Sequence, residues 1–132
     1  LQNITIQSFD VNLTSTSTET VEVYWRTGTY DGFEASSAGW TLAGTFSVTG
    51  LGAGTLTPLN ANLNIQVNAG QRIALYITTS GSANLEYTNG SGVGTVYTSN
   101  ADLEIYEGLG LAHAFGSSFS PRVWNGTIIY CP

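Results

Sequence analysis

The sequence predicts an all-β fold, an antiparallel β-sandwich with jelly-roll or Greek-key connections and about eight or nine strands. Apolar and polar residues alternate along most of the chain, which is the pattern of half-buried strands. No stretch keeps apolar residues at helical spacing over several turns. Turn-forming Gly, Asn and Ser separate the alternating segments at short intervals, as they do in sandwiches and barrels.

The first strand is expected over residues 3–13, where the alternation changes phase once. Its apolar residues form two sets of opposite parity, Ile4 with Ile6, and Phe9 with Val11 and Leu13. Such a change indicates either a β-bulge or a strand that passes from one sheet to another.

Further strands are expected wherever alternation resumes between turns. These segments are residues 21–26, 40–48, 56–59, 63–67, 72–79, 84–88, 95–98, 102–107 and 122–131. The segment with Pro58 should lie at a sheet edge, because proline has no N–H for a ladder. Long loops are expected at 27–39 and 108–121, and the second is apolar enough to fold back over one end of a core. Without a repeat or a linker, residues 1–132 should form one domain.

The charge composition restricts the partners of this chain. Only 9% of the residues are charged, Lys is absent, and the formal net charge is -6. Nucleic acids and anionic membranes attract clustered Lys and Arg, so neither is an expected partner. Sugars, protein surfaces and further copies of the chain are compatible with this surface.

The expected setting is extracellular. The chain contains no Met and begins with Leu1, as a secreted protein does after a signal peptide is removed. No apolar run approaches the roughly 20 residues of a membrane-spanning helix. We therefore expect a secreted or cell-surface protein without a membrane span.

Catalytic motifs are weak in this sequence. Asp102 and Glu104 are two residues apart on an expected strand, which places them about 7 Å apart, within the range of glycosidase carboxylate pairs. The alternative is a solvated outer face, because Leu103 and Ile105 require the inner one. His113 is the only histidine, and no nucleophile motif is present. We therefore expect no enzymatic activity and no cofactor.

Metal-binding residues are also few. A zinc site needs several His or Cys ligands, and the chain has one of each. Asp31 and Glu34 offer oxygen ligands for calcium in the loop 27–39, although their spacing differs from an EF-hand, and the alternative is a solvated acidic loop. Cys131 is expected to be a small buried apolar residue or, alternatively, to form an intermolecular disulfide.

Aromatic residues suggest a sugar-binding surface. Trp25 and Trp40 are in phase with the apolar residues of their strands and should belong to the core. Trp124 lies beside an Asn-Gly turn, so we expect it to be exposed. Trp124, Tyr30 and Tyr24 are therefore the candidates for stacking against sugar rings. Four sequons offer possible glycosylation sites, at Asn3, Asn12, Asn89 and Asn125.

The N-terminal segment is a candidate assembly strand. Detachable terminal strands and open sheet edges allow β-domains to polymerise by strand addition. Residues 1–13 are apolar and contain no charge before Asp10, so this segment could exchange with a neighbouring subunit. The side chains that would carry this exchange are Ile4, Ile6, Phe9, Val11 and Leu13. The alternative is an ordinary first strand, paired within its own sheet.

Two stretches resemble a family of uncharacterised β-sandwich modules from secreted bacterial proteins. They are VEVYWRTGTY at 21–30, continuing to GWTL at 39–42, and FGSSFSPRVWNG at 115–126. The resemblance implies an extracellular bacterial setting in surface proteins or fibres, and it supplies no catalytic residues. We therefore expect a structural subunit of a filament or surface assembly that self-associates through strand pairing. The alternative is a carbohydrate-binding or adhesion module.

Overall fold

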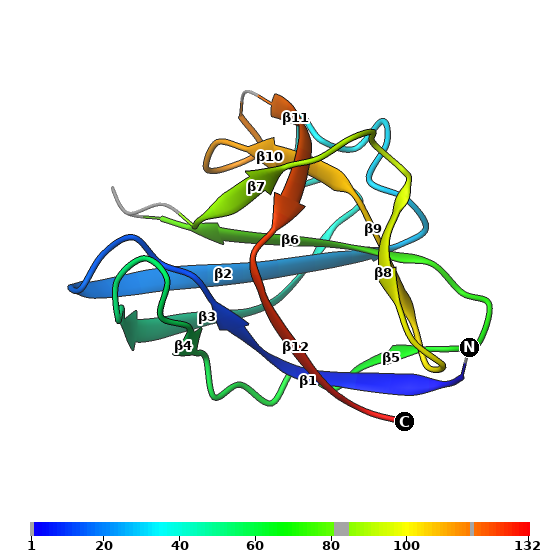
Figure 1. Ribbon diagram of the computed structural model, residues 1–132, viewed down its shortest axis with the longest axis horizontal. Helices are drawn as coiled ribbons and strands as arrows, with labels where there is room; N and C mark the ends of the chain where they lie inside the picture. The colour runs from blue at the N-terminus through cyan, green and yellow to red at the C-terminus, as the bar shows by residue number, and fades with distance from the viewer. Residues whose placement is uncertain (1, 81–84, 117) are drawn as a thin grey trace.

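The computed structural model describes residues 2–80, 85–116 and 118–132. Every regular element in these residues is a β-strand, and all strand pairs are antiparallel (Figure 1). The all-β prediction is confirmed. The same ranges contain no helix that could cross a membrane. Leu1 and Asn84, with which the expected N-terminal segment and seventh strand begin, lie outside the described residues.

The described residues form twelve strands in four small sheets, more than the eight or nine strands expected. They are β1 (Ile4–Val11), β2 (Thr18–Thr27), β3 (Thr41–Thr49), β4 (Thr57–Pro58), β5 (Ile65–Val67), β6 (Ile73–Thr79), β7 (Tyr87–Asn89), β8 (Val96–Ser99), β9 (Glu104–Tyr106), β10 (Gly108–Leu111), β11 (Ser118–Trp124) and β12 (Gly126–Cys131).

Two of the additional strands come from the C-terminal quarter of the chain. Residues 108–121 were expected to be a loop, but they contain β10 and the start of β11, which pair with each other. The single strand expected at 122–131 is divided at Asn125 into β11 and β12. Glycine is depleted in strands, so the glycines of 108–116 led to the prediction of a loop. The strand β10 forms there because β11 pairs with it.

β1 is the central strand of one sheet. It pairs with β12 on one side and with β4 and β5 on the other. The register shifts between Ile6 and Ser8, so the phase change reflects a β-bulge. The bulge directs both apolar sets of β1 into the core, where Phe9 and Val11 are fully buried.

β2 is the central strand of a second sheet, in the order β3-β2-β6. Val21 and Val23 of β2 are fully buried and belong to the same apolar cluster as the buried residues of β1. Trp25 packs against this cluster, as expected. Trp40 does not; it precedes β3 and contacts a separate group of aromatic rings.

The other two sheets, β10-β11-β7 and the β8–β9 hairpin, complete the fold. Figure 1 shows β7, β10 and β11 gathered beyond β6, whereas β1 and β12 lie at the opposite side of the view. The chain then passes from β11 through Asn125 into β12, so the end of β11 lies next to the core.

Candidate functional site

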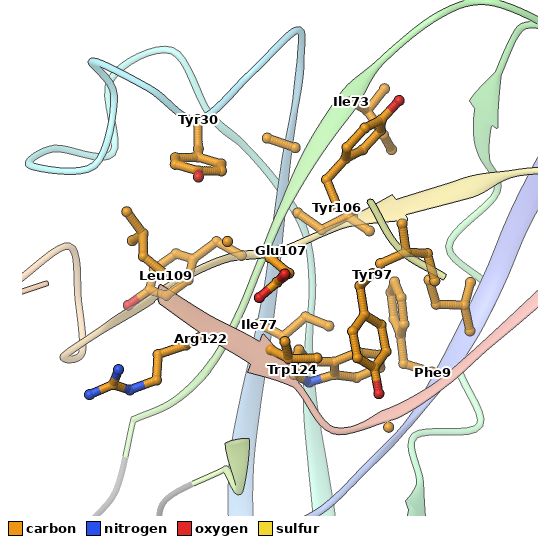
Figure 2. Close-up of a pocket in the computed structure, with 18 of the residues that line it drawn as sticks. Phe9, Tyr30, Ile73, Ile77, Tyr97, Tyr106, Glu107, Leu109, Arg122 and Trp124 are labelled. Atoms are coloured by element: carbon orange, nitrogen blue, oxygen red, sulfur yellow. The ribbon is translucent and has the colours of Figure 1, made fainter. Parts of the chain in front are cut away.

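A cavity of about 1150 Å³ lies between these sheets. Its apolar lining comes from β1 and β6, including Phe9, Ile73 and Ile77, and from Leu109 of β10. Figure 2 shows these side chains around one space, with Glu107 near its centre. Ligand pockets usually measure about 300–1,000 Å³ and combine apolar walls with a few polar groups, so this cavity is the strongest candidate binding site.

Tyrosines supply much of the aromatic wall. Tyr30, Tyr97 and Tyr106 line the cavity. The guanidinium carbon of Arg72 lies 4.1 Å from the centre of the Tyr106 ring, and the hydroxyl of Tyr106 donates a hydrogen bond of 2.6 Å to Glu104 Oε2. The wall therefore has flat faces whose edges are polar.

Glu107 lines the cavity as a buried carboxylate and is only 6% exposed. Thr95 Oγ1 donates a hydrogen bond to Glu107 Oε2 at 2.5 Å. The Ser91 hydroxyl donates to the same oxygen at 2.9 Å, and the Ser91 backbone N–H donates to Oε1 at 2.6 Å. These hydrogen bonds, of which that from Thr95 has the largest effect, lower the pKa of Glu107 below 4.5, although burial acts in the opposite direction. Gly90 packs so closely that a Cβ there would overlap Oε1 of Glu107. Glu107 therefore joins the 90–95 segment to the wall of the cavity.

Glu107→Gln should remove a pH-dependent contribution to stability. The folded-state pKa lies below 4.5, so the carboxylate stabilises the fold above that pH and loses this contribution as the pH falls through the folded-state pKa. The difference in unfolding free energy between wild type and Glu107→Gln should shrink as the pH falls from neutral to well below 4.5. Urea titrations of both proteins across this range measure it. A difference that is constant with pH would contradict the assignment.

Trp124 and Arg122 of β11 both line the cavity. The expectation that Trp124 is exposed is wrong, because its ring is partly buried and packs edge-on against Phe9, with 5.6 Å between ring centroids. Its Nε1 is buried, as is Nε of Arg122, and neither makes a hydrogen bond within the described residues. Arg122 donates through Nη1 to the Pro121 carbonyl at 2.9 Å and lies over the Tyr87 ring.

A second aromatic group lies on the outer side of the β2 sheet. The ring of Tyr24 stacks on Tyr76 and meets Phe115 edge-on, and Trp40 contacts the latter two rings. Burial and the neighbouring Glu22 raise the pKa of Tyr24. Two of these rings, Trp40 and Tyr76, also line the cavity. Of the three stacking candidates, only Trp124 and Tyr30 line the cavity, whereas Tyr24 belongs to this packed group.

His113 extends this outer group and has polar neighbours. Its Nδ1 lies 3.3 Å from Thr78 Oγ1 and 3.6 Å from Glu22 Oε1. The hydroxyl of Tyr76 donates to the Ala112 carbonyl at 3.2 Å. The apolar loop before β11 therefore folds back as expected, although it covers the outer face of the β2 sheet rather than one end of the core.

Asp102 and Glu104 already accept hydrogen bonds. Asp102 accepts from Gln2 and from Tyr130, both at 2.8 Å, and Glu104 accepts from Tyr106. Both residues line the cavity. Each carboxylate thus has a tyrosine partner: the bond from Tyr130 joins the Asp102 segment to β12, whereas Glu104 and Tyr106 lie on the same strand, β9.

The remaining candidates are separated from one another. Asp31 is exposed and Glu34 is half-buried and lines the cavity, but the described part of the chain brings no group of three His, Cys, Asp or Glu residues together. Calcium binding therefore stays a prediction. Cys131 is exposed as a free thiol, so the expectation of a buried residue is wrong.

Three of the four sequon asparagines have structural hydrogen bonds. The amide oxygens of Asn3, Asn12 and Asn125 accept from Ala69 N at 2.7 Å, Gly54 N at 2.9 Å and Thr88 Oγ1 at 2.9 Å. Asn89 is exposed at the end of β7. Glycosylation of the four stays a prediction.

Of the edge strands in the described part of the chain, β3 and β12 are the longest that contain no buried residue. Among the residues that the structure describes, β3 pairs only with β2, and β12 pairs only with β1. No residue of β3 is fully buried, and the same holds for β12. In contrast, β6, at the other edge of the β2 sheet, has four buried residues among seven.

β1, the expected assembly strand, has no such edge. Ile4 and Ile6 pair with β5, Val11 pairs with β4, and the other side of the strand pairs with β12. The structure places this segment within the sheet of its own chain. Exchange with a neighbour stays a prediction, because an exchanged strand would occupy the same position.

Sequence reasoning missed most of the cavity. Tyr97, Tyr106 and Glu107 were not among the predicted site residues. The first two could have been proposed, because they are tyrosines at exposed positions of expected strands. The position of Glu107 depends on its hydrogen bonds to Ser91 and Thr95, which no local pattern reveals. Comparisons with protein-family models, with curated proteins and with solved structures found no match.

Proposed function

We propose that this chain is a structural subunit of an extracellular bacterial filament or surface assembly, in which β12 of one copy pairs with β3 of the next. The observation that carries the proposal is that β3 and β12 are long edge strands without a buried residue. Neither strand contains a charged residue or an internal proline. Proteins that stay monomeric usually protect such edges with Lys, Pro or a cover of other segments.

The two edges lie on opposite sides of the molecule. β4 and β12 flank β1 on opposite sides, and the end of β3 packs near β4, around Val48 and Pro58. β3 is therefore on the side away from β12. Pairing between different edges on opposite sides is heterologous, and it generates an open polymer when the rotation does not close a ring.

The charge distribution supports the same arrangement. The chain carries a net charge of -6, which would oppose close association between acidic surfaces. Because β3 and β12 are uncharged, their backbones can pair without placing like charges opposite each other. A register shift opposite Tyr24 interrupts β3 near its start, so the regular residues 44–49 are the segment that we propose for pairing.

Thr45→Lys and Thr127→Lys should each abolish filaments without unfolding the subunit. Thr45 lies opposite Glu22, and Thr127 lies opposite Asp10, so each lysine gains an acidic cross-strand neighbour. Unfolding free energies should stay within about 0.5 kcal/mol of wild type. Electron microscopy and sedimentation should show filaments for wild type and monomers for either variant alone.

Mixing the two variants tests the head-to-tail arrangement. Thr45→Lys keeps an intact β12, and Thr127→Lys keeps an intact β3, so an equimolar mixture should form heterodimers that cannot extend. Thr55→Lys, the same substitution in an exposed turn, is the control and should polymerise like wild type. Filaments from either blocked variant, or none from wild type, would refute the proposal.

We infer a two-layer sandwich, because one apolar cluster contains buried residues of both β1 and β2, the central strands of two sheets. A secreted setting is supported by the absence of Lys and by the resemblance stated above. Asp102 and Glu104 each accept a hydrogen bond from a tyrosine, which supports a structural rather than a catalytic role for these two carboxylates.

The cavity favours a second candidate function, that of a carbohydrate-binding or adhesion module. Trp124 and Tyr30, two of the expected stacking residues, line it. Sugar binding would not interfere with assembly. A ligand would bind against the cavity wall formed by β8 to β11, so it would occupy neither β3 nor the outer edge of β12.

A further inference from the structure

The two strands proposed for pairing each contain one regular segment of six residues. In β3 the segment is 44–49, because a register shift precedes it and the N–H of Gly50, which follows it, already donates to the Ser17 carbonyl. In β12 the segment is 126–131, because Asn125 separates it from β11 and Pro132, which follows it, has no N–H to donate. The two segments therefore have the same length and can pair from end to end.

One face of each segment packs against the core of its own subunit. Phe46 and Val48 of β3 are half-buried and contact the apolar cluster, and Ile128 and Tyr130 of β12 do the same. The residues that alternate with them are exposed; they are Thr45, Ser47 and Thr49 on β3, and Thr127, Ile129 and Cys131 on β12. A strand from another copy covers the half-buried side chains only where the core-facing residues of both strands lie on the same face of the joined sheet.

The directions of the strands decide how these faces can be matched. In the two-layer arrangement inferred above, β3 and β12 lie in opposite layers, and Figure 1 shows them running in opposite directions across the view. To bring β3 of the next copy beside β12 with both core-facing sides on one face, that copy must be rotated by half a turn about the line that joins the two subunits. The rotation exchanges the two layers and reverses the direction of β3, so the paired strands become parallel.

We infer that β12 pairs with β3 of the next copy as a parallel strand, in the register that aligns residues 126–131 with 44–49. Successive copies then alternate in orientation along the filament. This inference rests on the proposed function and adds the direction and register of the interface between subunits.

This register places apolar side chains next to each other across the interface. Phe46 lies beside Ile128, and Val48 lies beside Tyr130, so pairing buries apolar surface that is half-exposed in the single subunit. An antiparallel ladder is slightly more stable per residue. It would put the core-facing residues of the two strands on opposite faces of the joined sheet, however, and leave this apolar surface uncovered.

Cys131 serves as the reporter of the register, because it is an exposed free thiol at the end of its segment. Neighbouring strands lie about 4.8 Å apart, which is within the Cα separation that a disulfide spans. Filaments of Thr49→Cys, oxidised with copper phenanthroline, should give a ladder of disulfide-linked multimers on a non-reducing gel. Thr45→Cys is the matched control: the inference places it beside Thr127, so it should give dimers at most.

A second pair of variants decides the outcome where Thr49→Cys alone does not assemble. With Cys131→Ser in both, Thr45→Cys combined with Thr127→Cys should give the ladder, whereas Thr49→Cys combined with Thr127→Cys should not. Electron microscopy before oxidation checks that each variant forms filaments.

The outcomes separate the register from the assembly itself. Ladders from the two controls in place of the two expected variants would show antiparallel pairing and overturn the inference, while assembly through β3 and β12 would stand. Filaments that give no ladder with any variant would also overturn the inference. Absence of filaments from the wild-type chain would instead refute the proposed function, and the inference with it.

Discussion

Phe9→Ala should lower the free energy of unfolding by roughly 3–5 kcal/mol. The Phe9 side chain is fully buried, and its ring packs edge-on against Trp124. Truncation removes this burial and the aromatic contact, and it adds empty volume beside an existing cavity. Because β1 pairs with β12 along one edge and with β5 and β4 along the other, the surroundings have little freedom to collapse into the space.

Urea unfolding followed by tryptophan fluorescence measures this loss. Leu51→Ala is the control, because Leu51 is 52% exposed and its truncation should cost less than about 1 kcal/mol. A loss for Phe9→Ala as small as that of the control would mean that Phe9 is not part of a packed core.

Gly50→Ala should lower the free energy of unfolding by roughly 1–3 kcal/mol. Gly50 follows β3, is buried, and donates its N–H to the Ser17 carbonyl at 3.0 Å. A Cβ at this position would overlap the backbone carbonyl oxygen of Ser15. The obstacle is backbone rather than a flexible side chain, so the 14–17 turn would have to move away from the 50–54 turn.

Gly92→Ala is the matched control for the second substitution. Its Cβ would lie 3.5 Å from Thr95 Cγ2, an ordinary contact, so its effect should be small. Thermal unfolding by circular dichroism compares the two variants. Equal melting temperatures for Gly50→Ala and wild type would show that the two turns are not in close contact.

The strands are the part of the fold that local sequence predicts well. The alternation of Val21, Val23 and Trp25 predicted both the strand β2 and the face that it buries. The phase change after Ile6 predicted either a bulge or a strand that switches sheets, and the structure shows a bulge in β1. Pro58 correctly indicated a short strand at a sheet edge. These features succeed because side chains alternate between the two faces of a strand, whatever its partner.

The errors occurred where distant segments overrode local preference. The glycine-rich β10 is a strand because β11 pairs with it, and Trp124 is half-buried because β11 brings it against Phe9. Cys131 is exposed because it lies on the outer face of β12 with Ile129, whereas Tyr130 between them packs against the core. None of these contacts leaves a trace within a short window of sequence.

The sequence by itself determined the all-β class, most of the strands, an irregularity in β1 after Ile6 and the weakly charged surface. Only the tertiary structure decided which strands became edges, and which donors of β11 and which carboxylates line the cavity. The physical reason is that alternation is a property of neighbouring residues, whereas strand order is set by hydrogen bonds between segments as far apart as Asp10 and Thr127. Pairing of that kind depends on the whole chain, and so do the open edges and the cavity that follow from it.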